Sequence, residues 1–381
     1  MLPPDLQSVI EALHAAPQRL VLEFAGAGSL ALGWLHSVAG SSQTILEATD
    51  RYAATSLADL LGTPPDQFVA VATAAAMAQR AYERALVLRD SPVPVLGVAC
   101  TATIATRRQK RGEHRCAIAV RSDAGVATYA LTLTRGERDR LGEETLVSRL
   151  LLWALVRGCA LDLPVALDLA ADEAVAEAWH PDPVARLLSG EIHSLLTHPD
   201  GRQEVDPTVS GALLSGSFNP LHAGHINLLQ AAAQTLQMPG LFELPVVNAD
   251  KGTLEVAEVT RRLLQFRGNH SVVLSRAPLF RAKADLFPGS VFVVGYDTAI
   301  RLVAPRYYGG EREMERALAG MRDQGCRFLV AGRVVAEQFH TLDAVPVPPA
   351  FRDMFIALPE DAFRVDLSST ELREQANKQR R

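Results

Sequence analysis

The chain has 381 residues, which is more than most single domains contain, so we expect two domains, each large enough to bury its own core. Hydrophobic residues make up 48% of the sequence and charged residues 21%, a balance that is typical of soluble globular proteins. The net charge of -5 gives no electrostatic reason to expect nucleic acid or an anionic membrane as a partner.

The cysteines and the N-terminal segment favour a cytoplasmic protein. The four cysteines are widely scattered and form no CxxC pair, so neither a disulfide framework nor a structural zinc site is expected. The segment MLPPDLQSVIEALHAAPQRL is polar and has prolines where a signal peptide would need its apolar region. No apolar run approaches the roughly 20 residues that a membrane span requires.

The N-terminal region alternates helix and strand patterns. Apolar residues recur at helical spacing over 5–13, and a strand pattern over 20–24 runs into the small-residue turn 25–29. The glycines of this turn could admit an anion, and tight packing of a helix on a strand explains them equally well. Helices are also predicted over 74–88 and 143–156, and strands over 95–100, 117–121 and 128–134. Alternating strands and helices predict an α/β domain.

The order of these pieces resembles the C-terminal domain of the competence-damage-inducible CinA family, which is the fold of bacterial nicotinamide mononucleotide deamidases. The resemblance rests on the turn at 25–29, Gly40-Ser41-Ser42, Tyr52 followed by Leu60-Leu61-Gly62, the helix over 74–81 and Gly136-Glu137-Arg138. CinA-like domains commonly self-associate, so the resemblance implies a homo-oligomer.

Positions that carry reactive hydroxyls in that family are changed in this chain. The serine and threonine positions of the family's turn fall on Ala25 and Ala27, and its lysine falls on Leu57. Amide hydrolysis needs a nucleophilic hydroxyl and a polar cradle for the oxyanion, and alanine supplies neither. We therefore expect residues 1–165 to keep the fold and to have lost deamidation.

The middle of the chain is rich in turn-forming residues. Clusters of Pro, Gly and Asp occur between about 163 and 207, with a short helix predicted over 183–188. We therefore expect residues 166–207 to be a linker, followed by a second domain over 208–381.

The second domain opens with GALLSGSFNPLHAGH, which has the pattern of a strand, a tight turn and a helix start. The strand precedes Gly216, which permits a turn that a side chain would obstruct, and Ser217 and Phe218 would present backbone N–H groups there. His222 and His225 are three residues apart and share one face of the first helical turn. Two cationic or hydrogen-bond-donating rings at the positive end of a helix dipole suit a triphosphate.

This segment resembles the GxFxPxHxGH signature of the nucleotidylyltransferase superfamily, and within it the nicotinamide mononucleotide adenylyltransferases. The resemblance implies a Rossmann-like parallel sheet, and it makes His222 and His225 the groups that stabilise the phosphates during transfer. No metal site is predicted from the histidine pair, since no Cys, Asp or Glu stands beside it.

Further segments fit the same family. LPVVNADK, ending in Lys251, resembles the strand and loop that contact the mononucleotide, and VFVVGYDT supplies Gly295 and Asp297, where the family binds ribose. The strand pattern CRFLVAGR delivers Arg333 to the same sheet edge. In an open parallel sheet, the carboxyl ends of the strands meet at one crevice.

The last segment, VDLSSTELR, resembles the family's phosphate-binding ISSTxIR signature. The resemblance implies that the β and γ phosphates are held by Ser368, Ser369, Thr370 and Arg373. Ser368 followed by Glu371 is also an ordinary capping box, and a capped helix start is itself an anion site. The family's second lysine and an aromatic residue after Asn248 are absent, so the acceptor stays open.

The function predicted from the sequence is transfer of an adenylyl group from ATP to nicotinamide or nicotinate mononucleotide, with release of pyrophosphate. Mg²⁺ would arrive with the triphosphate, since no carboxylate cluster stands ready to hold it. CTP in place of ATP stays open, as do two alternatives. One is a bifunctional protein whose N-terminal domain is a working deamidase, and the other is a nucleotide-binding regulator without catalysis.

Overall fold

The computed structural model describes residues 2–106, 112–248, 252–335 and 338–363. The chain divides into two compact α/β units, the first ending at Ala185 and the second beginning at Arg186. Both units are mixed α/β structures, as the sequence predicts. Within the described ranges, no helix combines the length and the apolar character needed to cross a bilayer.

The first unit is a six-stranded sheet with helices on both faces. The strands lie in the order β2-β1-β3-β4-β5-β6; β1 runs parallel to β2 and β3, and the others pair antiparallel. The strands are β1 (Arg19–Ala25), β2 (Ile45–Asp50), β3 (Val95–Thr103), β4 (His114–Arg121), β5 (Gly125–Leu133) and β6 (Ala176–Pro181). The helices are α1 (Gln7–Ala15), α2 (Ser29–Ser37), α3 (Ala54–Leu61), α4 (Val71–Leu88), α5 (Arg140–Gly158) and α6 (Pro183–Ser189), the last of which crosses the boundary between the units.

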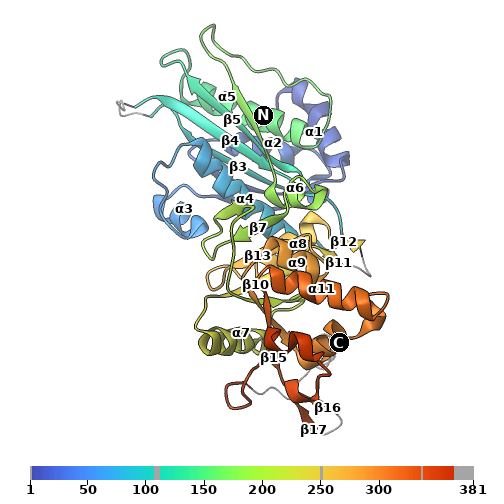
Figure 1. Ribbon diagram of the computed structural model, residues 1–381. Helices are drawn as coiled ribbons and strands as arrows, with labels where there is room; N and C mark the ends of the chain where they lie inside the picture. Colours follow the sequence, from blue (N-terminus) through green and yellow to red (C-terminus); the bar gives the residue numbers. More distant parts are fainter. Residues whose placement is uncertain (1, 107–111, 249–251, 336–337, 364–381) are drawn as a thin grey trace. The chain divides into compact units, whose positions relative to one another are not determined.

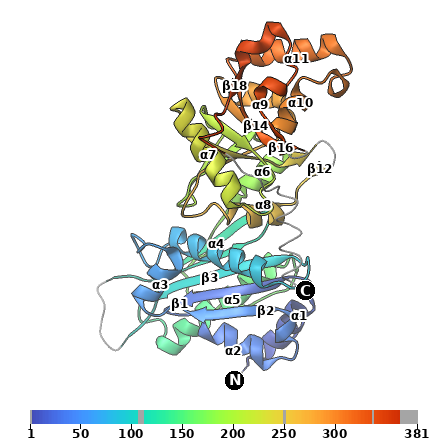
Figure 2. The same cartoon turned by 90° about the horizontal axis from the view of Figure 1, so that it is seen from below.

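The two faces of this sheet differ in side-chain size. Branched and aromatic residues such as Leu22, Val98 and Ile118 pack with α1, α2 and α5, whereas Ala99 and Ala119 pack with α3 and α4. Figure 2 shows these two sets of helices on opposite faces of the sheet. Small residues on that second face let α4 approach the strands closely. At Gly97 an added Cβ would lie 2.1 Å from the carbonyl oxygen of Ala78, so only glycine fits beneath this helix.

The second unit contains an eight-stranded sheet in the order β18-β15-β14-β9-β10-β13-β7-β8. The first six strands are parallel, and in chain order they lie 3-2-1-4-5-6, the arrangement of dinucleotide-binding folds. The strands are β7 (Ser194–Thr197), β8 (Gln203–Val205), β9 (Ala212–Ser215), β10 (Gly240–Pro245), β13 (Val272–Ser275), β14 (Val291–Gly295), β15 (Arg327–Ala331) and β18 (Phe355–Ala357). Two short hairpins add β11 (Val247–Asn248) with β12 (Gly252–Thr253), and β16 (Arg333–Val335) with β17 (Gln338–His340).

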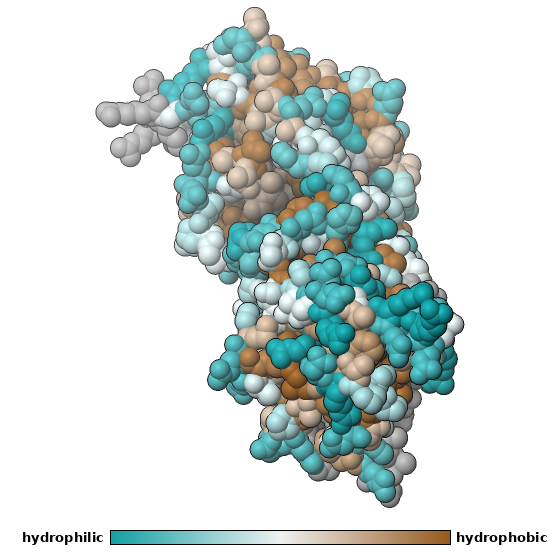
Figure 3. Space-filling view, in the orientation of Figure 1, coloured by the Kyte–Doolittle hydropathy of each residue, from teal (hydrophilic) through white to brown (hydrophobic). Residues whose placement is uncertain are grey.

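Helices cover both faces of the parallel part of this sheet. They are α7 (Ala223–Leu236), α8 (Val256–Leu263), α9 (Phe280–Leu286), α10 (Tyr296–Leu302) and α11 (Glu311–Asp323). In Figure 2, α7 lies on one side of the sheet and α9, α10 and α11 on the other, and Figure 1 also shows α7 opposite α9 and α11. Met314, Leu318 and Met321 of α11 are buried in the core, while the outer face of this helix is strongly hydrophilic (Figure 3).

The segment expected as a linker over 166–207 belongs to both units. Its first part supplies β6, the edge strand of the first sheet, and its last part supplies β7 and β8, the antiparallel edge of the second. The turn-forming residues of this segment separate strands of three to six residues instead of separating two domains. The unit boundary consequently lies at residues 185 and 186, inside the segment, instead of at its two ends.

The close approach at Gly97 gives a stability prediction for the first unit. Gly97→Val should lower the free energy of unfolding by at least about 3 kcal/mol, because the new side chain collides with backbone atoms of α4. Urea denaturation followed by tryptophan fluorescence measures this unit alone, because Trp34, Trp153 and Trp179 all lie in it.

Gly33, in the exposed interior of α2, is the matched control because an added Cβ there meets nothing within 4 Å. Gly33→Ala should raise the free energy of unfolding by roughly 0.5–1 kcal/mol through helix propensity. Equal effects of the two substitutions would contradict the close packing of α4 on β3.

Candidate functional site

The candidate site lies where β9 ends, beside β14, at the point where the strand order of the second sheet reverses. Ligands of open α/β sheets bind in the crevice at such a point. The backbone N–H of Gly216 still donates to the carbonyl oxygen of Glu243 on β10, at 3.0 Å. The chain then leaves the sheet and enters α7 at Ala223, with His222 as the N-cap residue in extended conformation. The predicted sequence of strand, turn and helix is therefore present.

Phe218 fixes the shape of this turn by packing its ring into the core. Its backbone has φ +43, in the left-handed region that a bulky residue rarely adopts, and its side chain is 1% exposed. The ring makes edge contacts with His225, Phe242 and Phe266, at centroid distances of 5.1, 5.2 and 5.5 Å. Backbone strain of roughly 1–3 kcal/mol is comparable to the roughly 1.5–3 kcal/mol gained by burying such a side chain. The packing of the ring thus offsets the strain of the turn.

The turn also explains the glycine before it and the amides within it. A Cβ at Gly216 would lie 2.8 Å from the Phe218 ring, so any larger residue would displace that ring. Ser217 is exposed, and neither its amide nor that of Phe218 donates to another described residue. Phe218 therefore faces the core, and it can serve a ligand only through its backbone.

His222 and His225 lie together at the first turn of α7, as their spacing predicts. Their rings are stacked, with a centroid distance of 3.7 Å and an interplanar angle of 26°. Burial lowers the pKa of both rings, and for His225 burial and the neighbouring His222 lower the pKa to about 4. Both rings are thus neutral at pH 7, so each can present an N–H donor but neither is a resident cation. Nδ1 of His225 is buried and has no hydrogen-bond partner among the described residues.

Side chains from α8 and from Gln265, two residues beyond its end, also hold the turn. Gln265 donates from Nε2 to the carbonyl oxygen of Phe218 at 2.9 Å and accepts from the Leu221 amide at 2.7 Å. Arg262 donates to the carbonyl oxygen of Ser217 at 3.0 Å. Two consecutive carbonyl groups of the turn are therefore occupied by donors, and its Leu221 amide is occupied by an acceptor.

Arg261 brings a second guanidinium group to the turn. It donates to Oδ1 of Asn219 at 2.9 Å, and its side chain is 44% exposed. Glu258 pairs with both Arg261 and Arg262 at 2.7 Å, and the hydrogen bonds from Arg261 lower the pKa of this carboxyl to about 2. The pair of arginines is thus oriented by one carboxylate that stays ionised. Arg262 and Gln265 carry no motif signal in the sequence, and only the fold shows their role.

Asp297 and Arg333 meet beside the carboxyl end of β14. Gly295 is the N-cap residue of α10, Asp297 lies in its first turn, and the Asp297 carboxylate forms an ion pair with Arg333. Both side chains are partly exposed, and next to them the rings of Tyr296 and His340 stack at 5.2 Å. The sequence brings both charged residues to one sheet edge, as predicted, but here they contact each other. A ribose hydroxyl or a phosphate would have to share or displace this pair.

Five of the predicted site residues lie outside the described residues: Lys251, Ser368, Ser369, Thr370 and Arg373. Their expected contacts with the mononucleotide and with the β and γ phosphates remain predictions from the sequence. The described part of the site consists of the turn, the histidine pair, the arginines of α8 and the Asp297–Arg333 pair.

The corresponding turn of the first unit is filled by the protein itself. Glu144 of α5 accepts from the amides of Gly28 and Leu30, at 3.0 and 3.2 Å, and from the Ser29 hydroxyl at 2.9 Å. This carboxylate thereby occupies the start of α2, where the sequence left room for an anion. Close by, a cavity of about 280 Å³ is lined by Arg51, Tyr52, Thr101, Thr103 and Arg140 among others.

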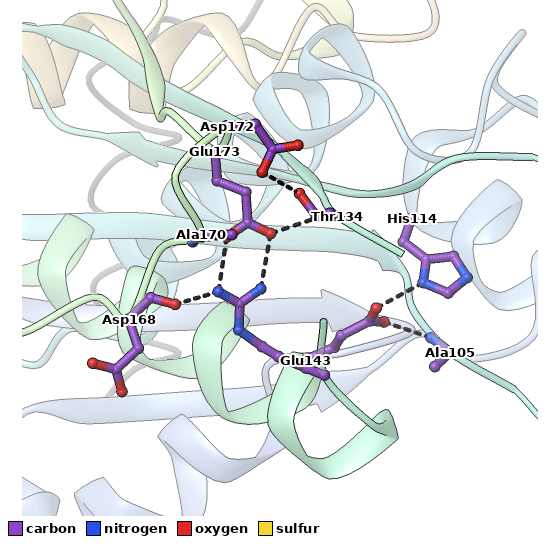
Figure 4. A network of polar contacts seen from close by, with 9 residues as sticks. Ala105, His114, Thr134, Glu143, Asp168, Ala170, Asp172 and Glu173 are labelled. Carbon is purple, nitrogen blue, oxygen red and sulfur yellow. Dashed lines mark hydrogen bonds and ion pairs between the residues drawn. The ribbon is translucent and has the colours of Figure 1, made fainter. Parts of the chain in front are cut away.

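Polar residues around the end of β3 form a structural network (Figure 4). The buried Glu143 accepts from the Ala105 amide at 2.6 Å and pairs with His114 at 2.7 Å. Arg138, which belongs to one of the segments that resemble the CinA family, pairs with Glu173 at 2.8 Å. Burial raises the pKa of Glu173, but hydrogen bonds from Arg138 and two backbone amides outweigh it and lower that pKa to about 2. Arg138 therefore serves the fold here.

Parts of the chain are similar to known proteins. Residues 213–375 match a family model described as Cytidylyltransferase-like. No curated protein matches the chain. Among solved structures, the competence/damage inducible protein CihA from Agrobacterium tumefaciens is 20% identical with a TM-score of 0.35, over 42% of this chain and 98% of that chain. A competence-damaged protein (CinA) superfamily protein from Escherichia coli is 17% identical with a TM-score of 0.31, over 40% of this chain and 86% of that chain.

The low pKa of His225 gives a prediction that needs no substrate. In NMR titrations of the histidine ring protons, the resonance that is lost in His225→Gln should titrate with a midpoint of about 4. The unfolded ring protonates near 6.5, so the unfolded chain binds the proton first as the pH falls. Protonation of this residue should therefore lower the free energy of unfolding progressively as the pH falls from about 6.5 to about 4. A midpoint at 6.5 would contradict the burial of the ring.

Proposed function

We propose that the protein transfers a nucleotidyl group from a nucleoside triphosphate to a phosphate acceptor, because residues 213–375 match the Cytidylyltransferase-like family model. The observation that carries the proposal is the stacked pair of His222 and His225 at the start of α7, above the turn that Phe218 holds. An acceptor oxygen attacks the α-phosphorus in line, the bond to the bridging oxygen breaks, and pyrophosphate leaves.

The donors at the turn fit an anionic ligand. The amides of Ser217 and Phe218, the neutral imidazoles of the histidine pair and the Arg261 guanidinium all offer hydrogens at one strand end. Preorganised donors of this kind stabilise charge that develops during transfer without having to reorganise. Phosphate oxygens near the histidines raise the pKa values of both rings toward the charged form, so protonation accompanies binding.

Adenylyl transfer from ATP to nicotinamide or nicotinate mononucleotide is the specific reaction that we propose. It is supported by the resemblance of GSFNPLHAGH to the adenylyltransferases of this superfamily. The family model carries the name of cytidylyltransferases, so CTP is the competing donor. Mg²⁺ enters with the triphosphate and would neutralise part of its charge. Lys251, Ser368, Ser369, Thr370 and Arg373 are proposed to complete the phosphate site.

Pyrophosphate release tests this proposal directly. The full chain is mixed with Mg-ATP or Mg-CTP and with either mononucleotide, and we expect turnover with ATP that depends on the acceptor. His222→Ala should lower kcat by about 10²–10³-fold while leaving nucleotide affinity within roughly threefold, because its donor acts mainly on the developing charge.

His193→Ala is the matched control, because His193 is an exposed histidine of the same unit, and it should leave kcat unchanged. If no donor and acceptor gave turnover but nucleotide binding were retained, the enzyme hypothesis would be rejected in favour of a nucleotide-binding regulator.

For the first unit, we propose that deamidation has been lost. Alanine stands at both hydroxyl positions of the turn, and Glu144 takes the amides of Gly28 and Leu30 that an anion would use. The full chain should therefore release no ammonia from nicotinamide mononucleotide above the uncatalysed rate, with a CinA-type deamidase assayed in parallel. Steady ammonia release would establish the bifunctional alternative instead.

A further inference from the structure

A buried ion pair lies next to Ser215, the residue that precedes the turn of the candidate site. Lys283 of α9 pairs with Glu243 of β10, and these two residues are 3% and 0% exposed. Nζ of Lys283 also donates to Oγ of Ser215 at 3.2 Å, and Ser215 is the last residue of β9, immediately before Gly216. Lys283 therefore contacts the last residue of β9, after which the turn begins.

The polar groups around this pair are satisfied by one another. Ser275, at the end of β13, donates its hydroxyl to Oε1 of Glu243, and its Oγ accepts from the Ala277 amide at 3.3 Å. Lys283 divides its donors between Glu243 and Ser215, and its ammonium group lies 5.6 Å from the centroid of the Phe280 ring. The network joins the ends of β9 and β13 to Glu243 of β10, next to the turn.

Burying two charges is expensive, and apolar residues of similar volume often fill such a site with no loss of stability. What an apolar pair cannot supply is a directed hydrogen bond to Ser215. Glu243 also holds the next residue, because its backbone oxygen accepts from the Gly216 amide at 3.0 Å. Two consecutive residues are thus fixed by the same glutamate, one through its backbone and one through its side chain and Lys283.

We infer that Lys283 is a positioning residue that, together with Glu243, sets where the nucleotide turn leaves β9. The part of this inference that concerns catalysis rests on the proposed function, whereas the part that concerns the position of the turn does not. Lys283 does not touch the histidine pair, so its effect on a ligand passes through Ser215 and Gly216.

The position of the turn is tested in the protein without nucleotide, by amide hydrogen exchange. Ser215→Ala removes one hydrogen bond and keeps the ion pair, while Lys283→Met with Glu243→Gln removes both charges and leaves no unpaired buried ion. Exchange in peptides that cover 213–222 should become at least about threefold faster in the first variant and about tenfold faster in the second. Arg281→Met with Asp285→Asn, an exposed pair on the same helix, is the control and should leave exchange unchanged.

Kinetics with the nucleotide give the second readout. Ser215→Ala should lower kcat by about tenfold with little change in KM, because a small misplacement of a positioning element costs rate more than binding. Ser215→Thr keeps the hydroxyl and should restore most of the rate, which a loss of packing alone would not explain.

Each outcome decides the inference. Faster exchange confined to the turn, with rescue by threonine, supports it. Unchanged exchange at the turn, equally faster exchange in β15, or full activity of Ser215→Ala would overturn it. A wild-type chain without turnover would remove the proposed function alone, because the exchange experiment still shows whether Lys283 sets the turn.

Discussion

The packing of the Phe218 ring against Phe242 and Phe266 is the contact on which the candidate site depends. Because this ring is buried, the backbone at residue 218 is held in a conformation that it would otherwise avoid. The same ring supports His225 from its edge, so one side chain fixes both the amides of the turn and the orientation of a histidine. Gln265 and Arg262 then occupy the outward carbonyl groups. The site is therefore built from core packing first and from polar contacts second.

The start of α2 in the first unit and the start of α7 in the second differ in which groups lie beside their backbone amides. In the first unit the start of α2 is closed by Glu144, a carboxylate of the same chain. In the second unit no described side chain is seen to cap the start of α7, whose N-cap residue His222 makes no side-chain cap hydrogen bond, and neutral rings stand beside it. A helix start that already holds a carboxylate repels a second anion, whereas one without a cap still has unsatisfied amides to offer. This contrast, more than any likeness of fold, separates the unit that we propose as catalytic from the other.

Much of this organisation could be predicted from the sequence, because it depends on local patterns. The apolar runs at 291–294 and 327–331 become parallel strands, and the signature around His222 gives the turn and the start of α7 at Ala223. Short edge strands such as β8 could not be predicted, since three residues between turn formers show no periodicity.

Contacts between residues far apart in the sequence could not be predicted, for a different reason. Lys283 and Glu243 are 40 positions apart, and Glu144 lies 116 positions from Gly28, so neither pairing leaves a trace in spacing. The neutral state of the histidines could not be predicted either, because it follows from burial and from the stacking of one ring on the other.

The Asp297–Arg333 pair sets a threshold for any ligand that uses either residue. Its side chains are 40% and 47% exposed, and an exposed ion pair of this kind contributes only about 0.2–1 kcal/mol. Since tenfold in affinity corresponds to roughly 1.4 kcal/mol, opening the pair reduces affinity by a factor of about five at most. Added salt weakens the pair and the contacts of a charged ligand together, so part of the salt dependence of binding cancels at this point of the site.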